Sequence, residues 1–358
     1  MEPTRTQVIK PRDTRNKPLI VHVIDSLGIG GAEQMLRKPL EAMTEYKHLI
    51  IALRDPIVLS DISPNIPIIN LHYSGKYSLF LILLRIRQLF RKHKPKIIHS
   101  HLLLSTLICR LTKPKRVKLF TTYHSLVYDP TSVQYNNRLR LLDKLTSFRS
   151  DVHIYVSNQV KIMYESSVIG DVRGKVIYNF FQPAFSHVER KLECDNLIRL
   201  VSVGNNRPEK GHKTLIAALE FLPENYLLTI VGKGFSEVMD QSSRLEIVET
   251  NEVWNVFRNK DLYISTSTHE GFGISVVEAM AMGLPTVISS SSTFQEVFGE
   301  SALYFETSNP ENLALRIRQI SESGENLKQY SLKSRECAKK YKMINYTEEL
   351  HKCYHDFG

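Results

Sequence analysis

Cysteines are scarce in this sequence, and none of them is closely paired with another. The 358 residues include four cysteines, Cys109, Cys194, Cys337 and Cys353, and no C-x-x-C pair. Zinc sites and the disulfide frameworks of small secreted domains need closely spaced cysteines or several bridges. The cysteine content therefore excludes a disulfide mini-protein, gives no support for a zinc site, and predicts a reducing, cytoplasmic environment.

Long hydrophobic runs are also missing. The run from Leu79 to Leu84 stops at Arg85, far short of the about 20 apolar residues that span a bilayer. Residues 1–18 are polar, basic and interrupted by proline, and they lack the apolar middle of a secretory signal. We therefore expect a flexible basic tail at 1–18 and no transmembrane segment.

What is present describes a globular protein with an uneven charge. Hydrophobic residues make up 42% of the chain and charged residues 23%, and at roughly 150 residues per domain the length predicts about two domains. Residues 1–190 carry 29 Lys and Arg against 14 Asp and Glu, whereas residues 191–358 carry 18 against 23. The basic first half indicates an anionic partner, which nucleic acid, an anionic membrane or a phosphate-bearing substrate would each satisfy.

Short runs rich in Val, Ile and Leu alternate with helical patterns along the chain. In the first half the expected parallel strands are 19–24, 49–53, 66–71, 97–99, 117–122 and 152–156, with helices at 79–90 and 138–148. In the second half the expected strands are 197–203, 226–231, 262–265, 285–288 and 302–305, with helices at 214–221, 274–282 and 313–321. This alternation is typical of doubly wound α/β sheets.

The polar segment 183–196 interrupts the alternation and is the predicted linker. We interpret the chain as an α/β protein with two Rossmann-like, doubly wound domains, at 19–182 and 197–340. The remaining segment, 341–358, is expected to form a C-terminal helix. Open α/β sheets bind ligands at the carboxyl ends of their strands, so the ligand site is expected in a cleft between the two domains.

The first glycine-rich segment follows the first strand. Gly28, Gly30 and Gly31 let the backbone approach a ligand closely before a helix begins. Glu33 stands where the dinucleotide fingerprint has its third glycine, so a nicotinamide cofactor is not expected. A plain strand-to-helix turn remains the alternative.

The second half opens with a strand, a polar turn and another helix. Arg207 and Lys210 lie in that turn, followed by Gly211. Two cations at the carboxyl end of a strand suit a pyrophosphate, because charge-assisted hydrogen bonds to phosphate are about twice as strong as neutral ones. A solvated turn with incidental charge is the alternative interpretation.

The most informative stretch is STSTHEGFGISVVEAMAMGLPTVISS at 265–290. Backbone amides of residues 271–275 are expected at the positive end of a helix, where they would hold a diphosphate. Glu270 precedes this loop and Glu278 follows it within the helix, so each carboxylate can accept hydrogen bonds from hydroxyls. The alternative places both glutamates at the surface, but the apolar neighbours of Glu278 favour a buried setting.

Together these motifs resemble a known family, the retaining GT-B glycosyltransferases of the glycosyltransferase 4 kind. That family's hallmark is a glutamate, seven residues and a second glutamate, and Glu270 and Glu278 match it. The other matching segments are GGAE at 30–33, HSH at 99–101, TTYHS at 121–125, VS at 156–157, YN at 178–179, PEKG at 208–211 and VVEAMAMGLP at 276–285. The resemblance covers nearly the whole chain after the tail.

The resemblance implies roles for particular residues. Glu270 would contact hydroxyls of the transferred sugar, Glu278 would hold the ribose of the donor, and Lys210 would bind its diphosphate. His124 is similar to the family's active-site histidine. The catalytic residues are thus expected to be His124 and Glu270, and the donor-binding residues Gly30, Gly31, Arg207, Lys210, Gly271, Phe272, Gly273, Ile274, Ser275 and Glu278.

The sequence departs from the family pattern at one point. The family usually has an arginine directly after the glycine that ends the strand, whereas Asn205 and Asn206 follow Gly204 here. Arg207, displaced by two positions, is expected to reach the same phosphates.

Metal binding has little support in the sequence. His99 and His101 fall on one face of a strand, but no third ligand has diagnostic spacing, and no D-x-D pair occurs anywhere in the chain. We therefore expect no metal and no cofactor, with cationic side chains and helix amides taking over the role of an ion.

The segment 77–96 combines a leucine-rich helical pattern with six cations. It is interpreted either as a surface that binds an anionic membrane or as an ordinary domain helix with a basic end. With the first interpretation, the protein would be cytoplasmic and peripheral on the inner face of the membrane.

The function expected from the resemblance is transfer of a sugar from a nucleotide-sugar donor, preferably a UDP-sugar, to a hydroxyl of a glycan or lipid-linked glycan acceptor, with retention of configuration. A nucleotide-sugar epimerase of the same architecture is the enzymatic alternative, and it would consume donor without acceptor. A basic nucleic-acid-binding module is the other alternative. It lacks any recognisable nucleic-acid-binding motif, so nucleic acid is not an expected partner.

Overall fold

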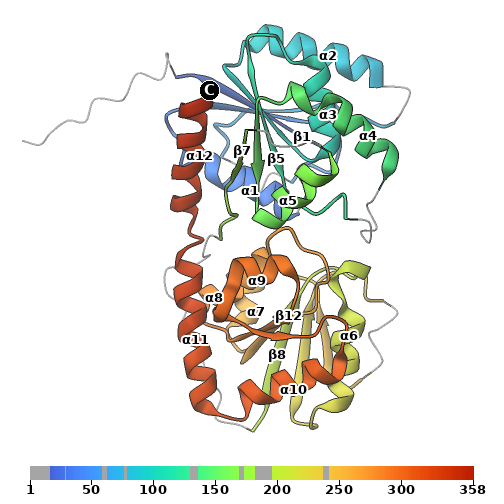
Figure 1. Ribbon diagram of the computed structural model, residues 1–358, viewed down its shortest axis with the longest axis vertical. Helices are drawn as coiled ribbons and strands as arrows, with labels where there is room; N and C mark the ends of the chain where they lie inside the picture. The colour runs from blue at the N-terminus through green and yellow to red at the C-terminus, as the bar shows by residue number, and fades with distance from the viewer. Residues whose placement is uncertain are drawn as a thin grey trace, which may run out of the picture.

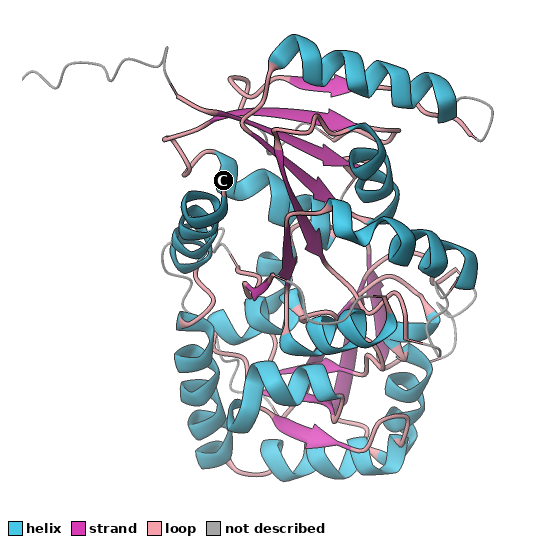
Figure 2. Ribbon diagram, turned by 45° about the horizontal axis from the view of Figure 1, so that its top comes forward, coloured by secondary structure: helices cyan, strands magenta, loops and turns pink. Residues whose placement is uncertain are grey.

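The structure is a computed structural model that describes residues 17–28, 30–58, 63–75, 79–129, 136–168, 173–181, 196–236 and 242–358. The chain forms two α/β domains, one above the other in Figure 1, each with a central parallel sheet. Figure 2 shows helices on both sides of each sheet. The predicted tail lies outside the described residues except for Lys17 and Pro18, and the predicted linker lies outside them except for Asn196.

The N-terminal domain is built on a sheet with the strand order β3-β2-β1-β4-β5-β6-β7. These strands are β1 (Leu19–Ile24), β2 (Lys47–Ala52), β3 (Ile68–Asn70), β4 (Ile97–His101), β5 (Lys118–Tyr123), β6 (Val152–Tyr155) and β7 (Gly174–Val176). The helices are α1 (Gly31–Leu40), α2 (Leu79–His93), α3 (Leu103–Thr112), α4 (Asn137–Thr146) and α5 (Asn158–Ser167). The order reverses between β1 and β4, which is the point where doubly wound sheets bind ligands.

The C-terminal domain has the sheet order β10-β9-β8-β11-β12-β13. The strands are β8 (Ile198–Val203), β9 (Tyr226–Val231), β10 (Leu245–Val248), β11 (Leu262–Ser265), β12 (Thr286–Ser289) and β13 (Leu303–Phe305). The helices are α6 (His212–Ala218), α7 (Val253–Phe257), α8 (Ile274–Ala281), α9 (Ser292–Phe298), α10 (Pro310–Ser321) and α11 (Gly324–Lys339). The predicted fold class, two Rossmann-like domains, is confirmed.

The last helix returns to the N-terminal domain. α12 (Met343–Phe357) follows α11 upward in Figure 1 and packs against the first sheet. Tyr346, Leu350 and Tyr354 belong to the same buried cluster as Phe120, and the Tyr354 hydroxyl lies 2.5 Å from Nδ1 of His99. The C-terminal segment therefore ties the two domains together.

Polar contacts also join the domains beside the cleft. The Glu296 carboxylate of α9 accepts hydrogen bonds from the backbone amides of Asn158 and Gln159, at 2.7 and 2.9 Å. These amides belong to the first turn of α5, where backbone donors lack partners within the helix. The Tyr178 hydroxyl donates to the same carboxylate at 3.0 Å. Glu296, a residue of the C-terminal domain, thus caps helix α5 of the N-terminal domain.

The expected elements agree with the structure in most of the core. The strands at 19–24, 226–231 and 262–265 have the predicted bounds, and each of the other predicted strands differs by one or two residues at one or both ends. The helix expected at 138–148 ends at Thr146 and continues as a 3-10 turn, Ser147–Arg149. Sequence reasoning assigned no element to α3, α5, α7, α9, α11, β7 or β10.

Candidate active site

A cavity of about 1630 Å³ lies between the two domains. Its walls come from the carboxyl ends of β1, β5, β8 and β9 and from the beginnings of α1 and α8. Every residue predicted for the site lines it: Gly30, Gly31, His124, Arg207, Lys210, Glu270, Gly271, Phe272, Gly273, Ile274, Ser275 and Glu278. The structure therefore gathers residues that are up to 248 positions apart in the chain around one space.

Lys210 and Glu270 meet at this cavity. The 3-10 turn Pro208–Lys210 packs against the segment after β11, because the Thr266 hydroxyl donates to the carbonyl of Lys210 at 2.9 Å and the Thr268 amide donates to that of Glu209. The Lys210 Nζ then lies 2.5 Å from the Glu270 Oε1, and the Ser267 hydroxyl donates to the same oxygen at 3.0 Å. With both side chains about three-quarters buried or more, this pair holds a cation and an acceptor at fixed positions.

Glycines shape the loop between Glu270 and α8. A Cβ on Gly271 would lie 2.2 Å from the carbonyl oxygen of His124, so only glycine permits this close approach of the two domains. Gly273 has a φ of +99° and precedes the first residue of α8. The backbone N–H groups of Val276 and Val277 donate to the carbonyl of Gly273. The amides of Ile274 and Ser275 precede these first helical hydrogen bonds, and this end of the helix borders the cavity.

The beginning of α1 lies opposite that loop. A Cβ on Gly31 would come within 3.1 Å of Cδ1 of Ile274, so the N-terminal ends of α1 and α8 are close neighbours across the cavity. Both helix ends carry partial positive charge. The predicted role of the first glycine-rich segment as a place of close backbone approach fits this geometry.

Glu278 lies in α8 with 9% of its surface exposed. Burial raises the pKa of its carboxyl to about 7, and the nearby charge of Lys38 opposes that rise. No described residue donates a hydrogen bond to the carboxylate. A buried carboxylate with free acceptor capacity at a cavity is suited to receive hydroxyl donors from a ligand.

His124 follows β5, and burial lowers the pKa of its imidazole to about 4. It is therefore neutral at neutral pH. Its Nε2 lies 3.5 Å from Nδ1 of His101, while its Nδ1 is buried with no partner among the described residues.

Behind His124, the histidines of the first sheet form a cluster. His22 pairs in register with His99 on the neighbouring strand, and together with His101 they place ligand atoms within 4.8 Å of one another. His22 is thus a third potential metal ligand beside His99 and His101, and the spacing of residues in the sequence did not indicate it. However, both ring nitrogens of His99 are already hydrogen-bonded, to Tyr354 and to Thr122, which favours the interpretation as a hydrogen-bonded core.

Phe272 and Arg207, two of the predicted donor-binding residues, differ in the burial of their side chains. The Phe272 side chain is buried, with its ring 5.1 Å from that of Tyr341, so its backbone is what it offers to the cavity. Arg207 is exposed at the rim and takes part in lining the cavity. The long guanidinium side chain is free to reach toward a bound phosphate.

The cavity also contains residues that sequence reasoning did not single out. Lys38 and Asn179 line it, and the Asn179 Oδ1 is buried without a partner in the described part of the chain. At the ends of β8 and β9, a Cβ on Gly232 would lie 2.1 Å from the carbonyl oxygen of Gly204. Trp254 also lines the cavity. Of these residues, only Asn179 was indicated by the sequence, because it belongs to the YN segment at 178–179 that matches the family.

Two protein-family models match the chain. The model described as Glycosyltransferase Family 4 matches residues 29–185, and the model described as Glycosyl transferases group 1 matches residues 187–337. Together they span nearly all of both domains. The chain belongs to the glycosyltransferase 4 family. The resemblance carried by the motifs is therefore confirmed, and the two facing domains form the GT-B fold.

Curated relatives and solved structures agree with this assignment. This chain is 29% identical over 130 residues to the serotype-specific mannosyltransferase WbdA of Escherichia coli, and the match covers 32% of this chain and 16% of that protein. It is 26% identical over 208 residues to a phosphatidyl-myo-inositol mannosyltransferase of Propionibacterium freudenreichii, covering 56% and 54%. The chain thus spans about half or less of the length of these relatives.

Among solved structures, Anabaena Alr3699/HepE in complex with UDP and glucose superposes with a TM-score of 0.79 at 17% identity. That similarity covers 94% of this chain and 99% of the other chain, and it shows the shared fold. Among the described residues, no helix is long and apolar enough to cross a membrane.

Proposed function

We propose that this glycosyltransferase moves a hexosyl group from a UDP-linked donor to a hydroxyl of a glycan or lipid-linked glycan, with retention of configuration and without a metal ion. The observation that carries the proposal is the contact between Lys210 and Glu270 beside the beginning of α8. The Lys210 ammonium group, the Glu270 and Glu278 carboxylates, which can accept hydrogen bonds from hydroxyls, and the amides of residues 271–275 all border one cavity.

In this reaction the bond between the anomeric carbon and the diphosphate oxygen breaks, and a bond from that carbon to the acceptor oxygen forms. The leaving diphosphate gains negative charge, which Lys210, Arg207 and the amides of residues 271–275 would stabilise. The acceptor proton passes to a donor phosphate oxygen on the same face, so no protein nucleophile is required. Lys210 forms an ion pair with Glu270, and the diphosphate would compete with that carboxylate for the ammonium group.

The identity of the donor is the first testable part of the proposal. Alr3699/HepE was solved with UDP and with UDP-glucose, which supports a uridine nucleotide. In a panel of UDP- and GDP-linked hexoses, we expect a UDP-hexose to give the largest rise in melting temperature and the fastest nucleotide release with acceptor. A GDP-mannose preference would contradict the uridine assignment and leave the transferase assignment intact.

The proposed acceptor class is supported by the names of two relatives, which mention phosphatidyl-myo-inositol and the O-antigen chain. Both are glycan or lipid-linked acceptors, and this supports the same class here. Product analysis separates the transferase from the epimerase alternative, since an epimerase would convert the nucleotide-sugar in the absence of acceptor.

Donor affinity is expected to depend on the ionisation of Glu278. With a pKa of about 7, this carboxyl is about one-tenth ionised at pH 6 and about nine-tenths at pH 8. The carboxylate accepts stronger hydrogen bonds from the ribose hydroxyls than the neutral acid does. We therefore expect the donor Kd to fall about tenfold from pH 6 to pH 8. Calorimetric titration at both pH values would measure this change.

The matched variant for this experiment is Glu278→Gln, which keeps the size of the side chain and does not titrate. Its donor Kd is expected to be the same at the two pH values. A tenfold change that persists in Glu278→Gln would assign the titration to another group and contradict the predicted role of Glu278.

A further inference from the structure

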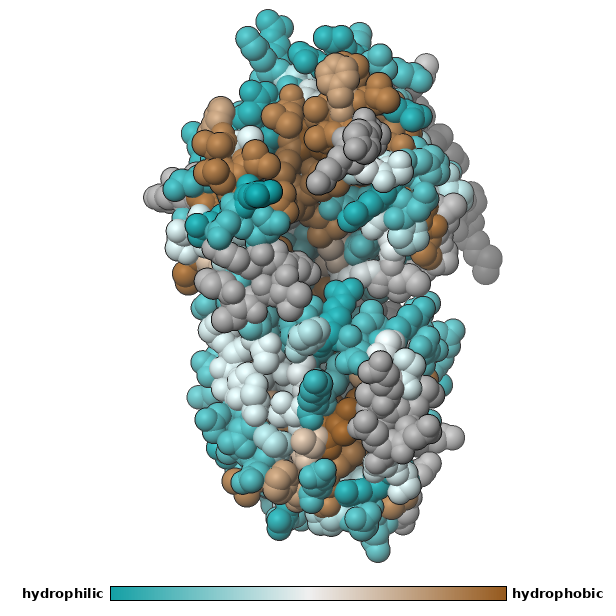
Figure 3. All heavy atoms as spheres, turned by 90° about the vertical axis from the view of Figure 1, so that its right-hand side faces the viewer, coloured by the Kyte–Doolittle hydropathy of each residue, from teal (hydrophilic) through white to brown (hydrophobic). Residues whose placement is uncertain are grey.

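The N-terminal domain presents an apolar surface on the side formed by α2, α3 and α4. α3 packs against both other helices, and Figure 3 shows brown side chains gathered over this side of the upper domain, whereas the lower domain is more mixed. We define the leucine face as the exposed apolar residues of this side: Phe80, Leu81 and Leu84 of α2, Leu111 of α3, Leu141, Leu142 and Leu145 of α4, and Phe148 after it. Their exposed fractions lie between 44% and 78%.

α4 has the reverse of the usual amphipathic arrangement. Its single buried residue is Asp143, whereas Leu141 and Leu145 are 57% and 61% exposed. These leucines stand two positions on either side of Asp143, about half a turn around a helix of 3.6 residues per turn. The polar side chain therefore points into the protein and the leucines point out.

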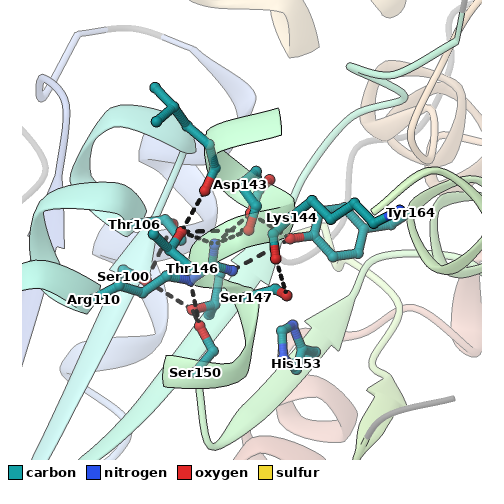
Figure 4. A network of polar contacts seen from close by, with 12 residues as sticks. Ser100, Thr106, Arg110, Asp143, Lys144, Thr146, Ser147, Ser150, His153 and Tyr164 are labelled. Atoms are coloured by element: carbon teal, nitrogen blue, oxygen red, sulfur yellow. Dashed lines mark hydrogen bonds and ion pairs between the residues drawn. The ribbon is translucent and has the colours of Figure 1, made fainter. Parts of the chain in front are cut away.

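Contacts of Asp143 fix this orientation. Its carboxylate pairs with Arg110 of α3, and both side chains are fully buried. The hydroxyls of Tyr128 and Tyr164 each donate to it at 2.6 Å, and Figure 4 shows Asp143 and Arg110 directed toward one another beside Tyr164. Rotating α4 to bury its leucines would break this pair, so the leucines face outward.

Cations accompany the leucine face. α2 contains no acidic residue, and its exposed cations are Arg85, Arg87, Arg91 and Lys92. On α4, Arg138 and Lys144 are exposed, and its one acidic residue is the buried Asp143. Apolar side chains surrounded by cations fit a surface that has an apolar interior and an anionic outer layer.

We infer that the leucine face docks this glycosyltransferase on an anionic lipid bilayer. The side chains of α4 and of the beginning of α2 would enter the boundary between headgroups and acyl chains, while Arg138, Lys144 and the α2 cations contact lipid phosphates. A second copy of the chain fits less well, because a two-fold dimer through this face would bring like charges together. The surface expected at 77–96 thus extends to α4, which contributes three leucines that are at least half exposed.

This surface is joined to a wall of the cavity by a direct contact. His124, Ser125 and Val127 line the cavity, and the hydroxyl of the next residue, Tyr128, donates to Asp143 of α4 at 2.6 Å. A bilayer bound at the leucine face would therefore lie beside the N-terminal wall of the active site. Lipid-linked acceptors would then reach the cavity without leaving the bilayer, a consequence that rests on the proposed function, whereas the docking itself does not.

The test is sedimentation of the full-length protein with vesicles of phosphatidylcholine, with and without added phosphatidylglycerol. We expect binding to the anionic vesicles that weakens as the ionic strength rises. The variant Leu141→Ser/Leu145→Ser should bind them about tenfold more weakly or worse, because each leucine loses its burial in lipid. Arg138→Gln/Lys144→Gln should reduce the preference for anionic over neutral vesicles, and a variant that also replaces Arg85, Arg87, Arg91 and Lys92 with Gln should lose it.

The C-terminal domain offers matched controls. Leu315→Ser/Leu332→Ser removes two leucines that are 57% and 58% exposed, and Lys328→Gln/Lys340→Gln removes two exposed cations. Both should bind as the unchanged protein does. Donor-induced stabilisation in all variants would show that each is folded.

Two results would overturn the inference. One is equal sedimentation of the unchanged protein with neutral and anionic vesicles, or none with either. The other is a dimer in sedimentation velocity that Leu141→Ser/Leu145→Ser converts to a monomer, since this would make a second copy the occupant of the leucine face. Loss of transfer with retained vesicle binding would instead count against the proposed function alone.

Discussion

Replacing Lys210 with alanine is expected to lower kcat of sugar transfer about 100-fold or more. The ammonium group of Lys210 lies 2.5 Å from Glu270 in the cavity and would stabilise the diphosphate as its bond to the sugar breaks. Because the charge on the leaving group grows in the transition state, its loss should reduce kcat more than it raises the donor KM. Steady-state kinetics with donor and acceptor both varied would separate the two effects.

Glu270→Gln is expected to reduce kcat to a similar extent, because the side-chain amide has one acceptor oxygen in place of two and no longer forms an ion pair with Lys210. The effects of the two changes should be less than additive, since the side chains act as one unit. Lys213→Ala, an exposed lysine of the neighbouring helix α6 that does not line the cavity, serves as the control. Near-normal turnover in both site variants, with unchanged melting temperatures, would contradict the site.

The sequence was sufficient to predict those parts of the fold in which a buried strand has a continuous apolar run. β9 and β11 are such strands, and their predicted bounds agree with the structure. β7 and β10 are only three and four residues long and largely half-buried, so their composition carries no strand pattern. α3 was missed because LLLSTLI continues the apolar run of β4 without a turn residue.

The candidate site divides in the same way. Residues within a local motif, such as Lys210 and Glu270, could be identified from the sequence, although the pairing of the two side chains could not. Lys38 and His22 could not be identified from the sequence. The distance from Lys38 to Glu278 depends on how the two domains pack, and that from His22 to His99 depends on which strands pair. A local sequence pattern contains no information on such distances.

α4 shows how tertiary contacts override a hydrophobic pattern. Its leucines predict a helix, and they would ordinarily be assigned to the buried side. Arg110, 33 positions earlier, decides the orientation instead, because a fully buried guanidinium requires a carboxylate partner. The outward orientation of the α4 leucines therefore follows from the charge of Arg110 on α3.

The largest expected effect on stability concerns this pair. Asp143→Asn should lower the free energy of unfolding by about 3–5 kcal/mol, because it leaves the Arg110 guanidinium buried without its counter-ion. Tyr128 and Tyr164 would also lose their charged acceptor. Urea unfolding followed by fluorescence and by circular dichroism would measure the change. Glu322→Gln, which removes an exposed pair with Arg318, should change the free energy by less than about 0.5 kcal/mol.

A double variant separates the cost of the unpaired charge from the loss of the pair itself. Arg110→Met/Asp143→Leu removes both charges and keeps apolar bulk, so it should be more stable than Asp143→Asn although it carries one more substitution. A double variant that is the least stable of the three proteins would mean that the ion pair is itself a net source of stability. An Asp143→Asn variant within 1 kcal/mol of the unchanged protein would contradict the buried pair as the anchor of α4. The outward orientation of Leu141 and Leu145 would then need another cause.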